Sequence, residues 1–210
     1  MSIAKTYRVI AYIDGFNLYF GINADPQRRR WLWLNVQEMA RRFLRQDQAL
    51  VKTKYFTARI GGPEDKRKRQ NAYLDALGTL DPGSFEIIFG KYQYEPFPCH
   101  NCGYAGISPK EKMTDSNIAV EMMKDGIANA FDTAILVCGD SDQKPTISAV
   151  HSVWPEKRVV VAFPPDRVSD DLRSVAAAHF VISESHLRHS QFPNCFAVNG
   201  RHHVKPFAWK

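Results

Sequence analysis

The sequence has 210 residues, of which 44% are hydrophobic and 24% are charged. This length supports one well-cored domain, and this balance is ordinary for a globular protein. No apolar run approaches the roughly 20 residues that a membrane-spanning helix needs, and the first residues lack the cleavage pattern of a signal peptide. We therefore expect a cytoplasmic protein with no membrane partner. The 4 cysteines are too few for a disulfide scaffold.

Short β-prone runs alternate with segments of helical periodicity. In chain order they predict a strand at 7–13, helices at 17–22 and 35–44, a strand at 50–58, a helix at 63–77, a strand at 85–89, a helix at 114–128, a strand at 133–138, a helix ending at 153, a strand at 158–163, a helix at 169–177 and a strand at 179–182. Residues 92–107, rich in proline and glycine, are predicted to be irregular. The alternation predicts an α/β fold, with a mostly parallel sheet covered by helices on both faces.

Positive charge is concentrated in the first third of the chain. Residues 1–70 contain 15 Lys and Arg against 6 Asp and Glu, whereas the remaining residues contain 13 against 16. Basic runs of this kind attract polyanions such as RNA, although they also occur on solvated helix faces. The candidate substrate contacts in these runs are Arg28, Arg29, Arg30, Lys66 and Arg67.

Acidic residues follow two of the buried strands. Asp14 ends the first strand, and Asp140 and Asp142 follow the strand at 133–138. In an open parallel sheet, ligands bind beyond the carboxyl ends of the strands, so we expect these side chains to meet. Asp115 lies in the first turn of the helix at 114–128, on the face that we expect to pack on the sheet, so it should join them.

Each acid alone is more typical of a turn or a helix cap. Together, however, carboxylates in one crevice repel each other unless a cation neutralises them, and hard oxygen ligands suit Mg²⁺ or Mn²⁺. Such a site can hold phosphodiester oxygens and activate water. Glu121 is a weaker candidate, because it lies roughly 240° around the helix from Asp115.

Three further residues fit this chemistry. Asn17 adds no charge and can position a phosphate or a water. Ser141 can orient a carboxylate or a water, and Lys112 can steady charge on the scissile phosphate. A Ser/His/Asp hydrolase fits less well, because Ser141 lacks the Gly-x-Ser-x-Gly setting.

At these residues the sequence resembles the NYN family, a branch of the PIN-like nucleases. The matching stretches are YIDGFNLYFG (12–21), EKMTDSNIAVEM (111–122), ILVCGDSDQKPTI (135–147), RVVVAFPP (158–165) and SHLRHSQFP (185–193). The resemblance implies a doubly wound, PIN-like fold and a ribonuclease that depends on Mg²⁺ or Mn²⁺. It carries metal ligation onto Asp14, Asp115, Asp140 and Asp142, and places Asn17 beside them.

Proline and glycine content and the loss of periodicity divide the chain into parts. We expect a nuclease domain at 1–189, with an irregular, cysteine-containing insertion at 96–109, and a C-terminal extension at 190–210 that is either packed or loosely docked. Two residues depart from the family pattern. Gln143 replaces an apolar residue, and Glu121 stands where many members have aspartate.

Cys99 and Cys102 resemble half of a zinc knuckle. A closed tetrahedral zinc site would need further ligands, from His100 and from Cys195 or a neighbouring chain. A loop that merely contains cysteines is the favoured reading, and Zn²⁺ is the alternative.

Two other features of the sequence each have two interpretations. The segment Trp31–Leu34 either stacks bases beside the basic run or packs in the core, and core packing is favoured for aromatics this dense. Arg167 and Arg173 either contact a phosphate or form surface salt bridges.

We therefore predict a metal-dependent ribonuclease with RNA as partner, and a homo-oligomer is a further alternative. Asp14, Asp115 and Asp140 would hold the metal, and Asp142 would bind a second ion or orient water. The first rival is a non-catalytic module of the same fold that binds RNA or protein. The second, a small-molecule phosphatase, ranks last because no Asp-x-Asp motif follows the first strand.

Overall fold

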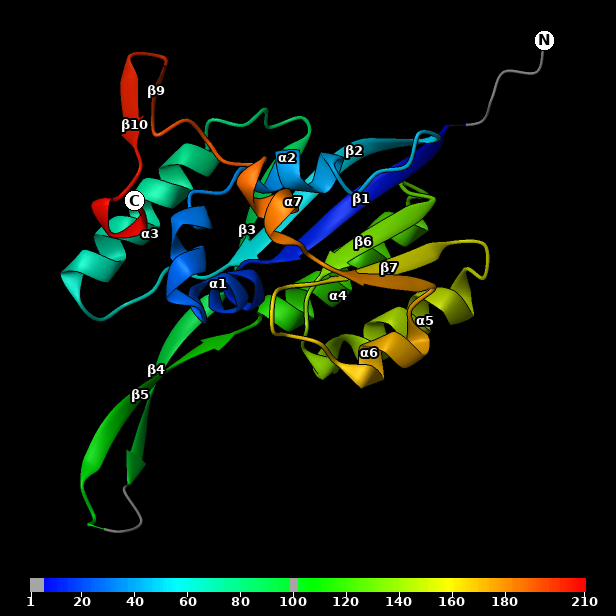
Figure 1. The fold of residues 1–210 in the computed structure, drawn as a ribbon. Coiled ribbons are helices and arrows are strands. Elements are labelled where there is room, and N and C mark those ends of the chain that lie inside the picture. Colours follow the sequence, from blue (N-terminus) through cyan, green and yellow to red (C-terminus); the bar gives the residue numbers. More distant parts are fainter. Residues whose placement is uncertain (1–5, 99–101) are drawn as a thin grey trace.

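A six-stranded sheet runs through the middle of the molecule (Figure 1), in a computed structural model that describes residues 6–98 and 102–210. The strand order is β3-β2-β1-β6-β7-β8, and every pairing within this sheet is parallel. The strands are β1 (Tyr7–Asp14), β2 (Gln48–Thr57), β3 (Phe85–Phe89), β6 (Thr133–Val137), β7 (Arg158–Phe163) and β8 (Ala178–Val181). The predicted α/β class and parallel sheet are confirmed.

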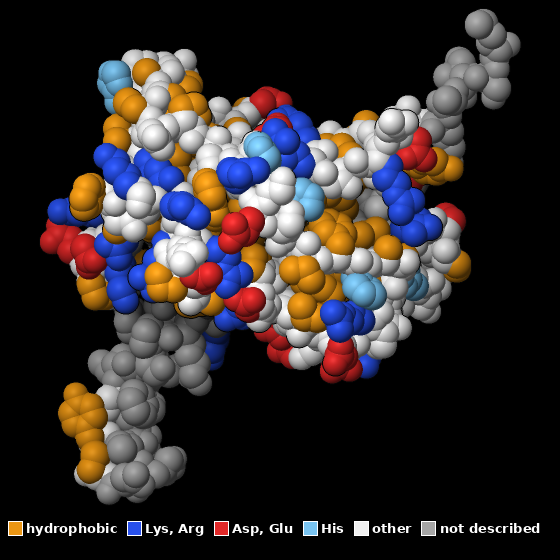
Figure 2. Space-filling model, viewed as in Figure 1, with side chains coloured by type: hydrophobic (Ala, Val, Ile, Leu, Met, Phe, Trp, Pro, Cys, Tyr) orange, Lys and Arg blue, Asp and Glu red, His pale blue; other side chains and the backbone are white. Residues whose placement is uncertain are grey.

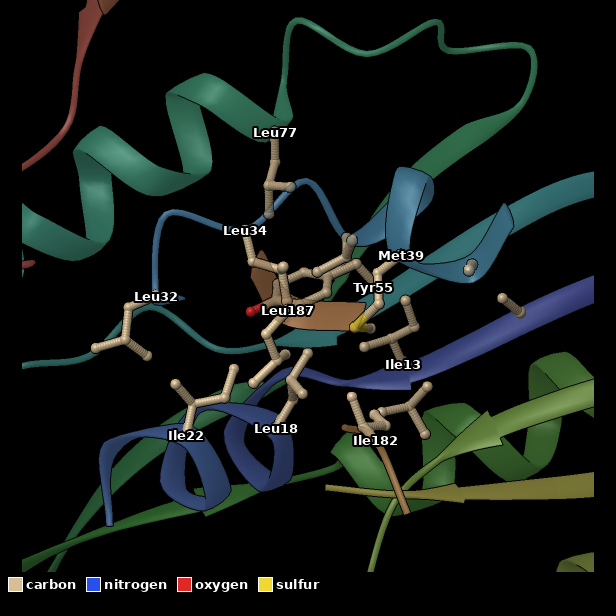
Figure 3. Close-up of a cluster of buried hydrophobic side chains, with 14 of the residues drawn as sticks. Ile13, Leu18, Ile22, Leu32, Leu34, Met39, Tyr55, Leu77, Ile182 and Leu187 are labelled. Carbon is tan, nitrogen blue, oxygen red and sulfur yellow. The ribbon is translucent and has the colours of Figure 1, made fainter. Parts of the chain in front are cut away.

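Helices cover both faces of the sheet and create two hydrophobic cores (Figure 1). Residues of β1 alternate between the cores, with Val9, Ala11 and Ile13 in one and Ile10 and Tyr12 in the other, as the period of a strand requires. Figure 3 shows the first core, where side chains of the helices meet those of the sheet. No described helix is both long and apolar enough to cross a membrane.

The helices divide cleanly between these two cores. The first core is lined by α1 (Gly15–Asn23), α2 (Val36–Arg41), α3 (Glu64–Leu77) and α7 (Glu184–Arg188). The second is lined by α4 (Thr114–Ile127), α5 (Lys144–Val153) and α6 (Asp170–Val175). The short 3-10 helices are η1 (Pro26–Trp31), η2 (Ser141–Gln143) and η3 (Phe207–Trp209).

The direction in which the chain is wound reverses at β1. From β1 the chain moves outward through β2 to β3, then returns to β6 on the other side of β1 and moves outward through β7 to β8. A crevice for ligands forms beyond the carboxyl ends of the strands at such a reversal. Asp14 ends β1, and Asp140 follows β6, so both lie at this crevice.

The segment predicted to be irregular forms a β-hairpin, which corrects the sequence prediction. Strands β4 (Lys91–Pro98) and β5 (Ala105–Lys112) pair antiparallel over eight positions and project from the body as an arm (Figure 1). Its prolines are tolerated because this two-stranded ladder has only edge strands, where a missing backbone N–H need not break a central ladder. The arm ends at Lys112, and α4 begins two residues later at Thr114.

The C-terminal extension is packed against the body. It contains the hairpin β9 (Cys195–Val198) and β10 (Arg201–Val204), and then η3. The Trp33 Nε1 donates a 2.8 Å hydrogen bond to the Pro193 carbonyl, and Trp209 is buried in the first core beside it. Core packing is therefore confirmed for Leu32, Trp33 and Leu34, all of which are buried.

A buried ion cluster joins the sheet to α4. Lys54 of β2 is 4% exposed, and its Nζ lies 2.7 Å from carboxylate oxygens of both Glu121 and Asp125. The Tyr12 hydroxyl donates a 2.6 Å hydrogen bond to Asp125. Charges removed from water in this way must be paired, so these groups fix one another's positions.

Candidate active site at the carboxyl ends of β1 and β6

Asp14 is buried at the junction of β1 and α1. Its carboxylate caps α1 by accepting a 2.9 Å hydrogen bond from the Asn17 backbone N–H. The Cys138 thiol lies 3.7 Å from the other oxygen of Asp14 and donates to it. Cys138 Sγ in turn accepts a 3.2 Å hydrogen bond from the Asp140 N–H. Asp14 and Asp140 thus flank one thiol, as convergence of the two strand ends predicts.

Asn17 holds the two strand ends together. Its side-chain oxygen accepts a 3.1 Å hydrogen bond from the Gly139 N–H, across 122 positions of sequence. Gly139 cannot be replaced without movement, because a Cβ there would lie 2.3 Å from the Arg167 carbonyl oxygen. The loop that carries Asp140 is therefore confined between α1 and the turn after β7.

Three carboxylates form what we call the acidic cluster: Asp115, Asp140 and Asp142. Each offers a ligand oxygen, and these oxygens all lie within 4.8 Å of one another. Asp115 comes from the first turn of α4, while Asp140 caps η2 by accepting a 3.1 Å hydrogen bond from the Asp142 N–H. Asp115 and Asp140 are half-buried and Asp142 is exposed. The cluster is thus open to solvent on one side.

The electrostatics of the cluster suit a bound cation. Burial raises the pKa of Asp115, and the negative charges of Asp140 and Asp142 raise this pKa further, against a hydrogen bond from Gln143 that lowers it. Burial also raises the pKa of the Cys138 thiol, with Asp14, Asp115 and Asp140 adding to the effect. Hard oxygen donors that repel one another at this spacing fit a dication such as Mg²⁺ or Mn²⁺.

Gln143 is a site residue that sequence reasoning missed. The side chain is 1% exposed, and its Nε2 donates a 2.9 Å hydrogen bond to the Asp115 carboxylate and a weaker one, at 3.3 Å, to the Asp115 carbonyl. It links η2 to the start of α4 and so sets where Asp115 points. The only signal in the sequence was an amide at a position where the family pattern has an apolar residue.

Two further acids lie outside this group of three. Asp14 lies beside the acidic cluster, where one of its oxygens caps α1 and the other accepts a hydrogen bond from Cys138, and metal ligation by Asp14 stays a prediction. Glu121 is paired with Lys54 and Lys124, so it does not face the strand ends. Ser141 is exposed between Asp140 and Asp142 at the start of η2.

The basic candidates differ in exposure and in ion pairing. Arg28 is committed to ion pairs with Asp25 and Asp166, whereas Arg29, Arg30, Lys66 and Arg67 are exposed. Lys112 is exposed at the end of the arm, two residues before α4. Figure 2 shows Lys and Arg side chains gathered on the half of this face formed by α3 and the N-terminal helices.

The two arginines that follow β7, Arg167 and Arg173, have different partners. Arg173 forms a 3.0 Å surface ion pair with Asp170, as one of the two readings predicted. The Arg167 guanidinium instead lies 5.5 Å from the centre of the Phe20 ring, and its backbone lies against Gly139. Arg167 is therefore an exposed residue whose backbone contacts the residue that precedes Asp140 and whose charged group lies over Phe20.

The predicted zinc half-site falls partly outside the described residues, because Cys99 and His100 lie there. Cys102 and Cys195 are exposed free thiols. Zinc binding at Cys99 and Cys102 stays a prediction.

A parallel α/β sheet with clustered carboxylates at its reversal point defines a nuclease-like fold with a candidate metal site. The family model for the NYN domain matches residues 8–184, and the chain belongs to this family.

Two further similarities place the chain among known proteins. It is 24% identical over 184 residues to a protein named 6-hydroxy-3-succinoylpyridine 3-monooxygenase HspA from Pseudomonas putida, covering 71% of this chain and 57% of that one. The chain thus spans little more than half the length of this curated relative. A crystal structure of a protein of unknown function from Vibrio parahaemolyticus superposes with a TM-score of 0.56 at 19% identity, over 88% of this chain and 98% of that one. The second similarity concerns the fold alone.

Proposed function

We propose that this NYN domain is a metal-dependent ribonuclease. The observation that supports this most directly is the acidic cluster at the carboxyl ends of β1 and β6, where three ligand oxygens lie within 4.8 Å of one another. Asp115, Asp140 and Asp142 would hold Mg²⁺ or Mn²⁺. When bound, such an ion polarises a phosphodiester and lowers the pKa of a coordinated water.

The residues around the cluster have separate tasks in this proposal. Gln143 positions the Asp115 carboxylate through its hydrogen bond, and Asn17 holds Gly139, and with it the Asp140 loop. Asp14 is fixed by two hydrogen bonds, and its negative charge, beside the three carboxylates of the cluster, further favours a cation there. Arg167 is exposed, and its backbone packs against Gly139, so we assign its side chain to contact a phosphate group of the substrate.

RNA is the substrate that the charge distribution favours. The exposed basic residues of η1 and α3 would attract an RNA backbone, whereas the acidic cluster would repel it unless a cation neutralises the carboxylates. Binding of RNA at the cleavage position and binding of metal should therefore be coupled, which distinguishes this site from a simple basic patch.

Cleavage of end-labelled RNA in the presence of Mn²⁺ tests the proposal. We expect Asp140→Asn and Asp115→Asn to abolish cleavage, while the control Glu156→Gln, an equally isosteric change at an exposed turn, retains it. Fluorescence anisotropy with the same RNA separates an enzyme from a binding module. Metal-independent binding with no cleavage by the unmodified chain would support the binding module instead.

The name of the Pseudomonas putida relative suggests a second candidate, the turnover of a substituted pyridine. The observation in its favour is an apolar cavity of about 380 Å³ next to Asp14, which would accept a small aromatic ring. We rank it below RNA cleavage, because it leaves the acidic cluster unused. Incubation with 6-hydroxy-3-succinoylpyridine, followed by chromatography, would show whether this compound is consumed.

A further inference from the structure

A cavity of about 380 Å³ lies between α1, α3 and the loop that joins β2 to α3. Its volume is within the range of pockets that bind small molecules. Figure 3 shows Leu18 and Ile22 projecting from α1 toward Leu32 and Tyr55, at the inner side of this space. Neither the acidic cluster nor the ion cluster at Lys54 uses this cavity.

The cavity adjoins the candidate active site directly. Gly15, which lines it, follows Asp14 in the chain, and Thr57, which also lines it, is one residue beyond the register partner of Asp14 in β2. Phe20 also lines the cavity, and the Arg167 guanidinium lies over its ring, 5.5 Å from the ring centre. Gly139, Arg167 and Phe20 thus form a series of contacts between the Asp140 loop and the wall of the cavity.

The walls of the cavity are aromatic and its rim is cationic. The aromatic side chains that line it are Phe16, Tyr19, Phe20, Tyr55, Tyr73 and Trp209. Lys66 and Arg69 of α3 also line it, and in the described part of the chain Lys66 has no carboxylate partner. Aromatic faces stack on any nucleobase, and lysine and arginine near them match the phosphates on either side.

Hydrogen bonds hold the walls in place. The Gln70 side chain donates a 2.8 Å hydrogen bond to the Ala58 carbonyl and accepts a 2.9 Å hydrogen bond from the Ile60 N–H. These two bonds fix the loop that lines the cavity. The Tyr73 hydroxyl donates a 2.8 Å hydrogen bond to the Leu34 carbonyl. A preformed pocket of this kind binds without the entropic cost of ordering its own walls.

We propose that this cavity receives an unstacked base of a single-stranded RNA substrate, next to the phosphodiester that the acidic cluster would cleave. The inference rests on the proposed ribonuclease function and adds a substrate class to it. A base within a duplex is stacked and paired, and taking it out has an energetic cost that a single strand does not incur. The cavity thus selects single-stranded over duplex RNA.

Two variants test the cavity from opposite directions. Tyr19→Ala removes a stacking surface, and Ile60→Trp fills the cavity without removing any wall. The matched control is Tyr7→Ala, because Tyr7 is 39% exposed against 36% for Tyr19 and lies at the opposite end of β1. Circular dichroism would establish that each variant is folded.

The readout is the affinity for a short single-stranded RNA, measured by fluorescence anisotropy in Ca²⁺, and the cleavage rate measured separately in Mn²⁺. We expect Tyr19→Ala and Ile60→Trp to bind about 5- to 100-fold more weakly, the effect of one lost base stack. Tyr7→Ala should bind as the unmodified chain does, and a blunt RNA duplex of the same length should bind weakly to all four proteins.

The outcomes distinguish this inference from the function on which it rests. If the chain cleaves RNA but neither cavity variant alters affinity, the inference is wrong and the ribonuclease proposal survives. If the cavity variants weaken RNA binding but the unmodified chain cleaves nothing, the cavity assignment stands and the enzymatic proposal fails. If Ile60→Trp blocks only the binding of 6-hydroxy-3-succinoylpyridine and leaves RNA binding intact, the cavity is a small-molecule site and the inference is overturned.

Discussion

Replacing Asp115 by asparagine should stabilise the metal-free protein while abolishing its response to metal. The Asp115 carboxylate is half-buried beside Asp140 and Asp142, and these neighbours and its burial raise its pKa. A raised pKa means that the folded state disfavours the ionised form, so at neutral pH the charge costs stability. Asparagine keeps an oxygen that can accept the Gln143 hydrogen bond. The substitution therefore removes the charge and keeps the contact with Gln143.

The size of this effect follows from the spacing of the carboxylates. Two unit charges 4.8 Å apart repel by about 1 kcal/mol in water and by about 3.5 kcal/mol at an effective dielectric constant of 20. Because the cluster is open to solvent on one side, we expect Asp115→Asn to raise the free energy of unfolding by about 1–2 kcal/mol in EDTA. For a chain of this length that corresponds to an increase in Tm of roughly 2–8 °C.

Thermal unfolding with and without Mn²⁺ measures both parts of the prediction. In EDTA the Tm of Asp115→Asn should exceed that of the unmodified chain, and the difference should shrink as the pH falls from neutral through the raised pKa of Asp115, because protonation removes the same charge. Millimolar Mn²⁺ should raise the Tm of the unmodified chain and leave that of the variant nearly unchanged. A variant that is less stable in EDTA, or that responds equally to Mn²⁺, would refute the reasoning.

Three other perturbations have defined outcomes. Lys54→Met leaves the partly buried Asp125 without its cation, while Glu121 keeps its pair with Lys124, and denaturant unfolding should show a loss of about 3 kcal/mol, the lower end of the range for a broken buried pair. Gly139→Ala forces the Asp140 loop away from the Arg167 carbonyl, so unfolding should become easier by about 1–3 kcal/mol and RNA cleavage should slow. Cys138 is buried and the pKa of its thiol is raised, so iodoacetamide should modify the exposed Cys195 but spare Cys138, as peptide mass spectrometry of the native chain would show.

Local patterns predicted most of the central sheet. The apolar runs at 7–13 and 133–138 became the neighbouring strands β1 and β6, because runs this apolar are stable only when both faces are covered. The prediction that Asp115 faces the strand ends was also right, since it depends only on the 100° step between residues of a helix. Both features follow from periodicity.

The features that sequence reasoning missed depend on contacts between distant segments. The arm was predicted to be irregular because prolines and glycines weaken local strand preference, yet pairing between β4 and β5 prevails over that preference. Asp14 was assigned to the metal because its type and position fit, and that assignment stays a prediction. What the sequence did not reveal is that the Asp14 carboxylate also caps the helix that follows the strand. The cavity combines α1, α3 and Trp209, which no spacing rule relates.

The ion cluster at Lys54 has a consequence for the rotational phase of α4. The ammonium group of Lys54, a residue of the central sheet, forms ion pairs with Glu121 and Asp125, which are one turn apart on α4. If α4 shifted by a single residue, it would rotate by about 100°. Both ion pairs would then be lost, and Asp115 would point away from Asp140. The ion pairs of Lys54 therefore fix the rotation of α4 and, with it, the position of Asp115 more than one turn away. Substitutions at Lys54 should displace Asp115 from Asp140 and Asp142 even where the chain still folds.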